Sequence, residues 1–131
     1  MKKISLLVLL YAGIVTTSVA QEQRDAGRLQ AYKIAFLTRK LSLTPEEAQK
    51  FWPIYNKYEG ELRAARIEGR TTKKEIETEE KILNIRKKYS TEFTKAISEE
   101  KVNQLFKAER EFSTIVQKEF LERRNQRRQR K

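Results

Sequence analysis

The stretch Leu43-Thr44-Pro45-Glu46-Glu47 contains a complete start signal for an α-helix. Thr44 fits the N-cap position, Pro45 fits the first helical position, and the Glu47 side chain can accept a hydrogen bond from the N-cap amide. After this signal, apolar residues recur at helical spacing as far as about Gly69, a residue suited to follow a helix end. These apolar residues are Phe51, Tyr55, Tyr58 and Leu62.

Similar signals lie on both sides of this predicted helix. Ile34, Leu37 and Leu41 indicate an earlier helix over residues 28–40. The T-x-x-E pattern of residues 72–75, and Ser98 followed by two glutamates, predict the starts of a third and a fourth helix. The third carries Ile82, Ile85, Tyr89, Phe93 and Ala96, and the fourth carries Val102, Leu105, Phe112, Ile115 and Val116. Strand patterns are absent, so the sequence predicts an all-α fold of four helices.

The apolar stripes are narrow and the polar faces are wide. Helices of about 20–25 residues would be about 30–37 Å long, so we expect elongated antiparallel hairpins with a thin core. Pro53 removes a backbone hydrogen bond inside the second helix, and we expect a bend there. One layer of such helices leaves apolar surface uncovered, which predicts an antiparallel homodimer.

Composition removes much of catalytic and metal chemistry. The 131 residues include no histidine, no cysteine and one methionine, and their net charge is +11. Without histidine or cysteine, the usual general base, thiolate nucleophile and zinc ligands are missing. Adjacent glutamates on a helix diverge by about 100° and do not face each other. We therefore expect neither enzymatic activity nor a cofactor, and no tight zinc, copper or nickel site; only hard cations such as calcium would suit the remaining oxygen ligands.

The first twenty residues resemble a secretory signal peptide. Lys2 and Lys3 precede an apolar run, and Ser18-Val19-Ala20 places small residues at a cleavage site before Gln21. We therefore expect export to the periplasm with cleavage after Ala20, a disordered polar segment at 21–27, and a helical domain at 28–121.

Residues 122–131 form a basic tail. We expect it to steer acidic partners or an anionic membrane surface toward the domain by electrostatic attraction. Nucleic acid remains an alternative only if the chain is not exported, because the pI of about 9.9 would then favour it. The cations of the tail are Arg123, Arg124, Arg127, Arg128, Arg130 and Lys131.

The helix-start signal occurs twice, 54 residues apart. Ile97-Ser98-Glu99-Glu100-Lys101 repeats the pattern of residues 43–47, and the same offset aligns Phe51 with Leu105 and Trp52 with Phe106. Two capped amphipathic helices can look alike without common origin, and a doubled helix–turn–helix unit is the alternative.

Both motifs resemble the LTxxQ motif of the Spy/CpxP family of periplasmic proteins. Leu43 and Thr44 lie at the first copy, and Ile97 and Ser98 lie at the second. Both copies depart from the motif at its glutamine: Glu47 can still complete a capping box, whereas the Lys101 side chain cannot accept a hydrogen bond. Residues 34–53 also resemble relatives described as sensors of extracytoplasmic-function (ECF-type) sigma factors. The resemblance implies a cradle-shaped antiparallel dimer that binds unfolded proteins without ATP.

The implied function is that of a periplasmic holdase or envelope-stress adaptor. Its alternatives are a signalling partner that binds a membrane stress-sensor domain and, less favoured, a metal-responsive sensor, since relatives have these roles. A concave aromatic face ringed by cations would bind clients or partners. Most of these aromatics also fit a core, and Trp52 and Phe106 are the better surface candidates because each lies one residue off its stripe. The face comprises Phe51, Trp52, Tyr55, Tyr58, Phe106 and Phe112.

Overall fold

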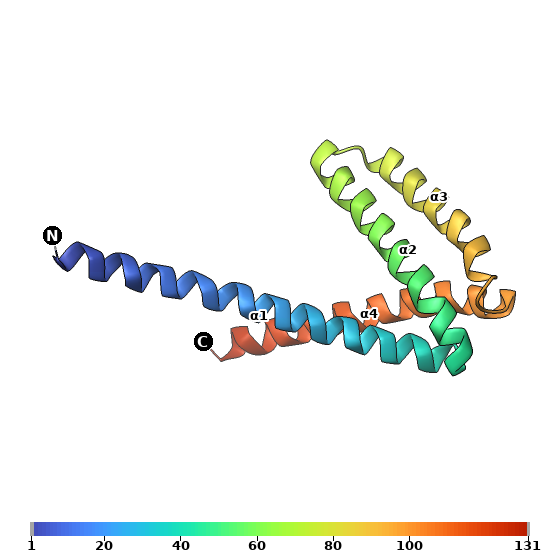
Figure 1. Cartoon of the computed structure of the whole chain (residues 1–131), viewed down its shortest axis with the longest axis horizontal. Helices are drawn as coiled ribbons and strands as arrows, with labels where there is room; N and C mark the ends of the chain where they lie inside the picture. Colours follow the sequence, from blue (N-terminus) through green and yellow to red (C-terminus); the bar gives the residue numbers. More distant parts are fainter. Residues whose placement is uncertain (1, 131) are drawn as a thin grey trace. The chain divides into compact units, whose positions relative to one another are not determined.

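Four α-helices make up the chain in a computed structural model that describes residues 2–130, with side chains described for residues 21–130. The helices are α1 (Lys2–Lys40), α2 (Pro45–Thr72), α3 (Glu75–Phe93) and α4 (Glu99–Gln129) (Figure 1). Residues 2–130 contain no strand, which confirms the predicted all-α class.

The helix α1 is longer than the sequence predicts. We expected disorder over residues 21–27 and a helix start near Arg28, and this is wrong, because α1 is continuous from Lys2 to Lys40. Residues 21–29 are all exposed, so helix propensity rather than packing accounts for the conformation; Gln, Glu, Arg and Ala all favour helices. The predicted signal peptide forms the first part of α1, and its side chains lie outside the described residues. The part of α1 up to Phe36 forms one compact unit, and residues 37–131 form another.

Within the second unit, α2 and α3 run side by side in opposite directions (Figure 1). Aromatic side chains of the two helices form the core between them. Phe93 lies with its ring centroid 5.4 Å from those of Phe51 and Tyr58, and Tyr89 lies 5.4 Å from Tyr58. Aromatic pairs at such distances contribute about 0.5–1.5 kcal/mol beyond the area that they bury.

The turn between α2 and α3 differs from the prediction. We expected α2 to end near Gly69 and Thr72 to cap α3, but α2 continues to Thr72, and Lys74 is the N-cap of α3 without a side-chain hydrogen bond. Thr72 Oγ1 instead donates to the Glu68 carbonyl at 3.0 Å. Lys73 turns the chain in the left-handed region, with φ of 56°.

Gly69 has a packing role rather than a capping role. A Cβ atom at this position would lie 2.9 Å from Thr78 Cβ on α3, closer than real contacts allow. The missing side chain therefore permits the close approach of α2 and α3 at this level.

The buried stripe of α4 ends before the helix does. Val102, Leu105, Ala108 and Phe112 are buried, and Ile115 and Val116 are half-buried. All side chains of residues 117–130 are exposed. The last part of α4 therefore carries the basic residues beyond the core as a helix rather than as a disordered tail.

Candidate functional site

The start of α2 has the predicted capping box. Thr44 Oγ1 accepts a hydrogen bond from the Glu47 amide at 3.2 Å, and Glu47 Oε2 accepts one from the Thr44 amide at 2.9 Å. Pro45 occupies the first helical position, where a missing N–H has no cost. The first motif is thus a helix-start device, as the sequence indicates.

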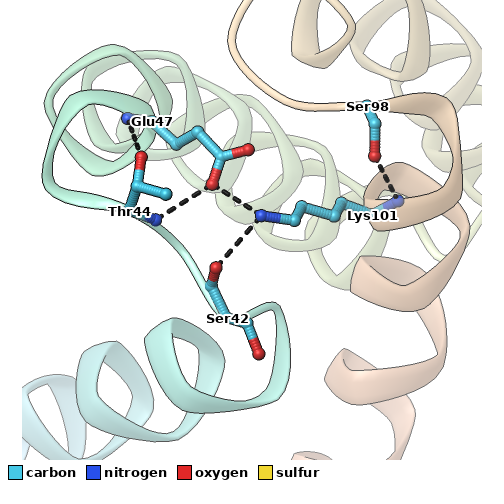
Figure 2. A network of polar contacts seen from close by, with 5 residues as sticks. All are labelled: Ser42, Thr44, Glu47, Ser98 and Lys101. Atoms are coloured by element: carbon cyan, nitrogen blue, oxygen red, sulfur yellow. Dashed lines mark hydrogen bonds and ion pairs between the residues drawn. The ribbon is translucent and has the colours of Figure 1, made fainter.

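The start of α4 has half of the same device. Ser98 Oγ accepts a hydrogen bond from the Lys101 amide at 3.3 Å, but Lys101 has no acceptor to return to the N-cap amide. The Lys101 side chain instead reaches the residues at the start of α2. Lys101 Nζ donates to Glu47 Oε2 at 2.6 Å and to the Ser42 carbonyl at 3.0 Å (Figure 2).

Glu47 therefore forms hydrogen bonds at the starts of both α2 and α4. One carboxylate oxygen accepts from the α2 N-cap amide and from the α4 lysine. The hydrogen bond from Lys101, and then the one from Thr44, lower the pKa of the Glu47 carboxyl below its usual value. The Glu47 and Lys101 side chains are 24% and 23% exposed, which reduces screening of the pair by solvent relative to a surface ion pair.

The two motifs meet at equivalent positions. Glu47 and Lys101 are 54 residues apart, the offset of the sequence repeat, and so are Tyr55 and Glu109, which form a hydrogen bond of 2.9 Å. The helices α2 and α4 also begin 54 residues apart, at Pro45 and Glu99. Both contacts therefore join positions that the 54-residue offset aligns, as a doubled helix–turn–helix unit would place them.

A second polar cluster lies at the hydroxyl groups of Tyr55 and Tyr58. Glu109 accepts hydrogen bonds from Tyr55 at 2.9 Å and from Tyr58 at 3.1 Å. Burial, and then the Glu109 charge, raise the pKa of both phenols well above their usual value, while the Arg86 guanidinium opposes this at Tyr58. Arg86 Nε is buried without a hydrogen-bond partner.

Sequence reasoning missed Glu109 and Arg86. Glu109 lies four residues after Leu105, on the apolar stripe of α4, and an acid at such a position is the signal that could have revealed it.

A third cluster joins α2 to α3. Glu61 Oε1 accepts from Tyr89 at 2.8 Å and from Lys88 Nζ at 2.9 Å. The hydrogen bond from Lys88, followed by that from Tyr89, lowers the pKa of Glu61, and the same contact with Glu61 raises the pKa of Lys88. Burial raises the pKa of Tyr89. These hydrogen bonds link α2 to α3.

The predicted aromatic face is wrong for four of its six residues. Phe51, Tyr55 and Tyr58 have exposed fractions of 0%, and Phe112 has 6%. Their regular spacing places them in the core, where a client cannot reach them. Trp52 and Phe106 are half-buried, in line with their positions beside the stripes, but the six do not form an exposed face.

Other apolar side chains are exposed. Ile76 is 78% exposed on α3, and Phe120 is 66% exposed on α4. Among residues 21–130, the other large exposed apolar side chains are those of Leu29, Tyr32, Ile34, Ile67, Leu83 and Leu121. The five arginines of the predicted tail are exposed as well, and Lys131 lies outside the described residues.

Two further features are absent from the described residues. No group of three or more acidic side chains among them lies close enough together to hold a metal ion. No helix in the same part of the chain has the length and apolar content needed to span a bilayer. No protein-family model, curated protein or solved structure matches this chain.

Proposed function

We propose that this chain is an ATP-independent holdase of the bacterial envelope, a Spy/CpxP-like protein that binds partly unfolded exported proteins. The observation that supports this function best is the exposure of large apolar side chains, such as Ile76 and Leu83 of α3, on densely charged helices. Such side chains provide weak apolar contacts, and the net charge, +11 for the whole chain and +9 without Lys2 and Lys3 of the predicted signal peptide, attracts acidic segments. Weak contacts of both kinds suit a protein that binds many unfolded chains.

The client-binding surface in this proposal differs from the aromatic face that the sequence indicates. Ile76 and Leu83 are exposed by 78% and 51%. They lie seven residues apart on α3 and hence on one side of that helix. Exposed lysines and glutamates occur between and beside them. We assign the first contact with a client to this side of α3.

Export and dimer formation belong to the same proposal. The pattern of residues 1–20 supports export, and the paired helix starts at Thr44 and Ser98 support the family resemblance. A second copy would cover part of the exposed apolar surface. Light scattering tests the dimer: a monomer mass at tens of micromolar, with helicity unchanged, contradicts it.

A turbidity assay tests the holdase function. Reduced α-lactalbumin, an acidic protein that aggregates on unfolding, serves as the client. At an equimolar ratio without ATP, the wild-type chain should suppress the aggregation, and the double variant Ile76→Ser, Leu83→Ser should suppress it less. The control is Asn56→Ser, Asn84→Ser, which changes exposed polar residues of the same hairpin.

The assay also separates the holdase from the signalling partner. A dedicated partner of a membrane stress-sensor domain should leave the aggregation of α-lactalbumin unchanged. That result, with a correctly folded protein, would reject the holdase and leave the signalling function as the better explanation.

A further inference from the structure

The exposed end of α4 has two distinct sides. At about 100° per residue, Arg123, Arg124, Arg127, Arg128 and Arg130 fall within an arc of roughly 160° of the helix circumference. Phe120 lies near the middle of this arc. The opposite half carries Glu122 and the amides Asn125, Gln126 and Gln129. We name the arc with Phe120 the arginine face.

Apolar groups lie within and beside the arginine face. Phe120 is 66% exposed, and Leu121, just past one edge of the arc, is 48% exposed. Glu119 lies just past the other edge and contacts Arg123 at 3.6 Å. Residues 119–130 hold five cations, all on the arginine face, and two carboxylates, both outside it, so the charge of the segment is strongly positive on one side.

The arginine face also continues the core stripe of α4. Phe112, Val116 and Phe120 follow one another at intervals of four residues, and their exposure rises from buried through half-buried to 66%. The apolar stripe of α4 therefore continues beyond the core to Phe120, and arginines follow it on the same side of the helix. All five arginines are exposed, so packing of the core formed by α2, α3 and α4 does not account for them.

We infer that the arginine face of α4 binds the surface of an anionic lipid bilayer. Guanidinium groups fit phosphate oxygens bidentately, and clusters of four to eight basic residues on a helix bind anionic lipid. A straight helix with its cations on one side matches a flat charged surface. Phe120 and Leu121 can enter the headgroup region, while the arginine stems extend their charges toward the phosphates.

An acidic protein segment or a second copy of the chain is less suited to this face. Both would supply carboxylates, but neither needs an exposed phenylalanine at the centre of a cationic face. The inference goes beyond the proposed function, because lipid binding does not require client binding.

Vesicle co-sedimentation of the full chain tests the inference. Vesicles of phosphatidylglycerol and phosphatidylcholine are compared with pure phosphatidylcholine, and residues 1–20 contribute equally in all variants. Changing the five arginines to glutamine should lower the partition coefficient on anionic vesicles at least tenfold, since each basic residue near such a surface contributes about 1 kcal/mol, or about fivefold. A matched variant removes five exposed cations from α2 and α3 and should retain more of the binding: Lys50, Lys57, Arg63, Arg70 and Lys87.

Tryptophan fluorescence gives a second readout. Phe120→Trp in a Trp52→Phe background should show a blue shift on anionic vesicles, and Ile67→Trp in the same background should not. Circular dichroism checks that each variant keeps its helicity.

Three outcomes overturn the inference. The first is equal partitioning of the five-arginine variant and its matched control. The second is binding to poly-glutamate without binding to anionic vesicles, which would assign the face to acidic protein segments. The third is concentration-dependent self-association that Phe120→Ser abolishes, with no vesicle binding by the wild type.

Discussion

Lys101 Nζ lies 2.6 Å from Glu47 Oε2, and the two residues hold the same position in two helix-start motifs 54 residues apart. The residue that fails to complete its own capping box thus binds the acid that completes the other one. This arrangement makes the stability of one helix start depend on the other.

The first prediction concerns this pair. Glu47→Gln keeps an acceptor for the Thr44 amide but removes the charge, and Lys101→Gln removes the cation. Each change should lower the urea midpoint of unfolding, and the double variant should lose less than the two single losses combined. A double-mutant cycle followed by circular dichroism measures this coupling; additive losses would show that the pair does not stabilise the fold.

The second prediction concerns acid. The pKa values of Glu47 and Glu61 are lowered in the folded chain from 4.5. Carboxyls of this kind stabilise the fold above their unfolded pKa, and the stabilisation is lost as the pH falls through the lower folded pKa. The free energy of unfolding should therefore decrease as the pH is lowered below about 5. This decrease should be less steep in the Glu47→Gln variant than in the wild type.

Urea titrations at pH 7 and pH 3 measure that difference. Glu46→Gln, at the exposed neighbouring position, is the control and should follow the wild-type slope. If the free energy of unfolding of Glu47→Gln changed as much between pH 7 and pH 3 as that of the wild type, the result would contradict the prediction.

The third prediction concerns the buried phenols. Tyr55→Phe leaves Glu109 with one hydrogen bond fewer and should cost about 1–2 kcal/mol. Tyr55→Ala also opens a cavity in the core and should cost about 3–5 kcal/mol. In a Glu109→Leu background the Tyr55→Phe cost should shrink; chemical denaturation of the four chains checks this, and an unchanged cost would assign the phenol another partner.

The fourth prediction compares two glycines of α2. Gly60→Ala should stabilise the fold by about 0.5–1 kcal/mol, because a Cβ there meets nothing within 4 Å and alanine favours helices. Gly69→Ala should destabilise it by about 1–3 kcal/mol, because the Cβ would collide with Thr78. The two substitutions should shift the midpoint of thermal unfolding in opposite directions. Shifts of the same sign would show that α3 moves away at Thr78 and makes room for the added Cβ.

The fifth prediction concerns the turn after α2. Lys73 has φ of 56°, a conformation that costs a residue with a Cβ about 1–2 kcal/mol. Lys73→Gly should therefore raise the free energy of unfolding by about 1 kcal/mol, even though glycine gives the unfolded chain more freedom. Lys74→Gly, at φ of −97°, removes no such strain and should not stabilise; equal effects at both positions would exclude strain as the cause.

Sequence patterns predicted the helices that begin with a side-chain cap. Thr44 and Ser98 fixed the starts of α2 and α4, because an N-cap is a local hydrogen bond between near neighbours. The start of α3 was misplaced, since the T-x-x-E pattern at Thr72 has the right residues while the chain continues as a helix through it. Thr72 lies instead in the last turn of α2, where its hydroxyl donates to the Glu68 carbonyl, and the local pattern does not distinguish this position from an N-cap.

The candidate site was predicted less well for a similar reason. Hydrophobic spacing identified Phe51, Tyr55 and Tyr58 but not whether a neighbouring helix covers them, and α3 does. Glu109 and Arg86 belong to the site only because α2, α3 and α4 meet there. The 54-residue offset was visible in the sequence, whereas the contact between equivalent positions required the structure.

The Glu47–Lys101 ion pair has a consequence for how this chain can diverge. Identical charges at two equivalent positions would repel, so opposite charges there give each half a distinct identity. Either residue can change only if its counterpart still complements it. Among sequences related to this chain, positions 47 and 101 should therefore covary, with uncharged amides at both or opposite charges in a fixed order.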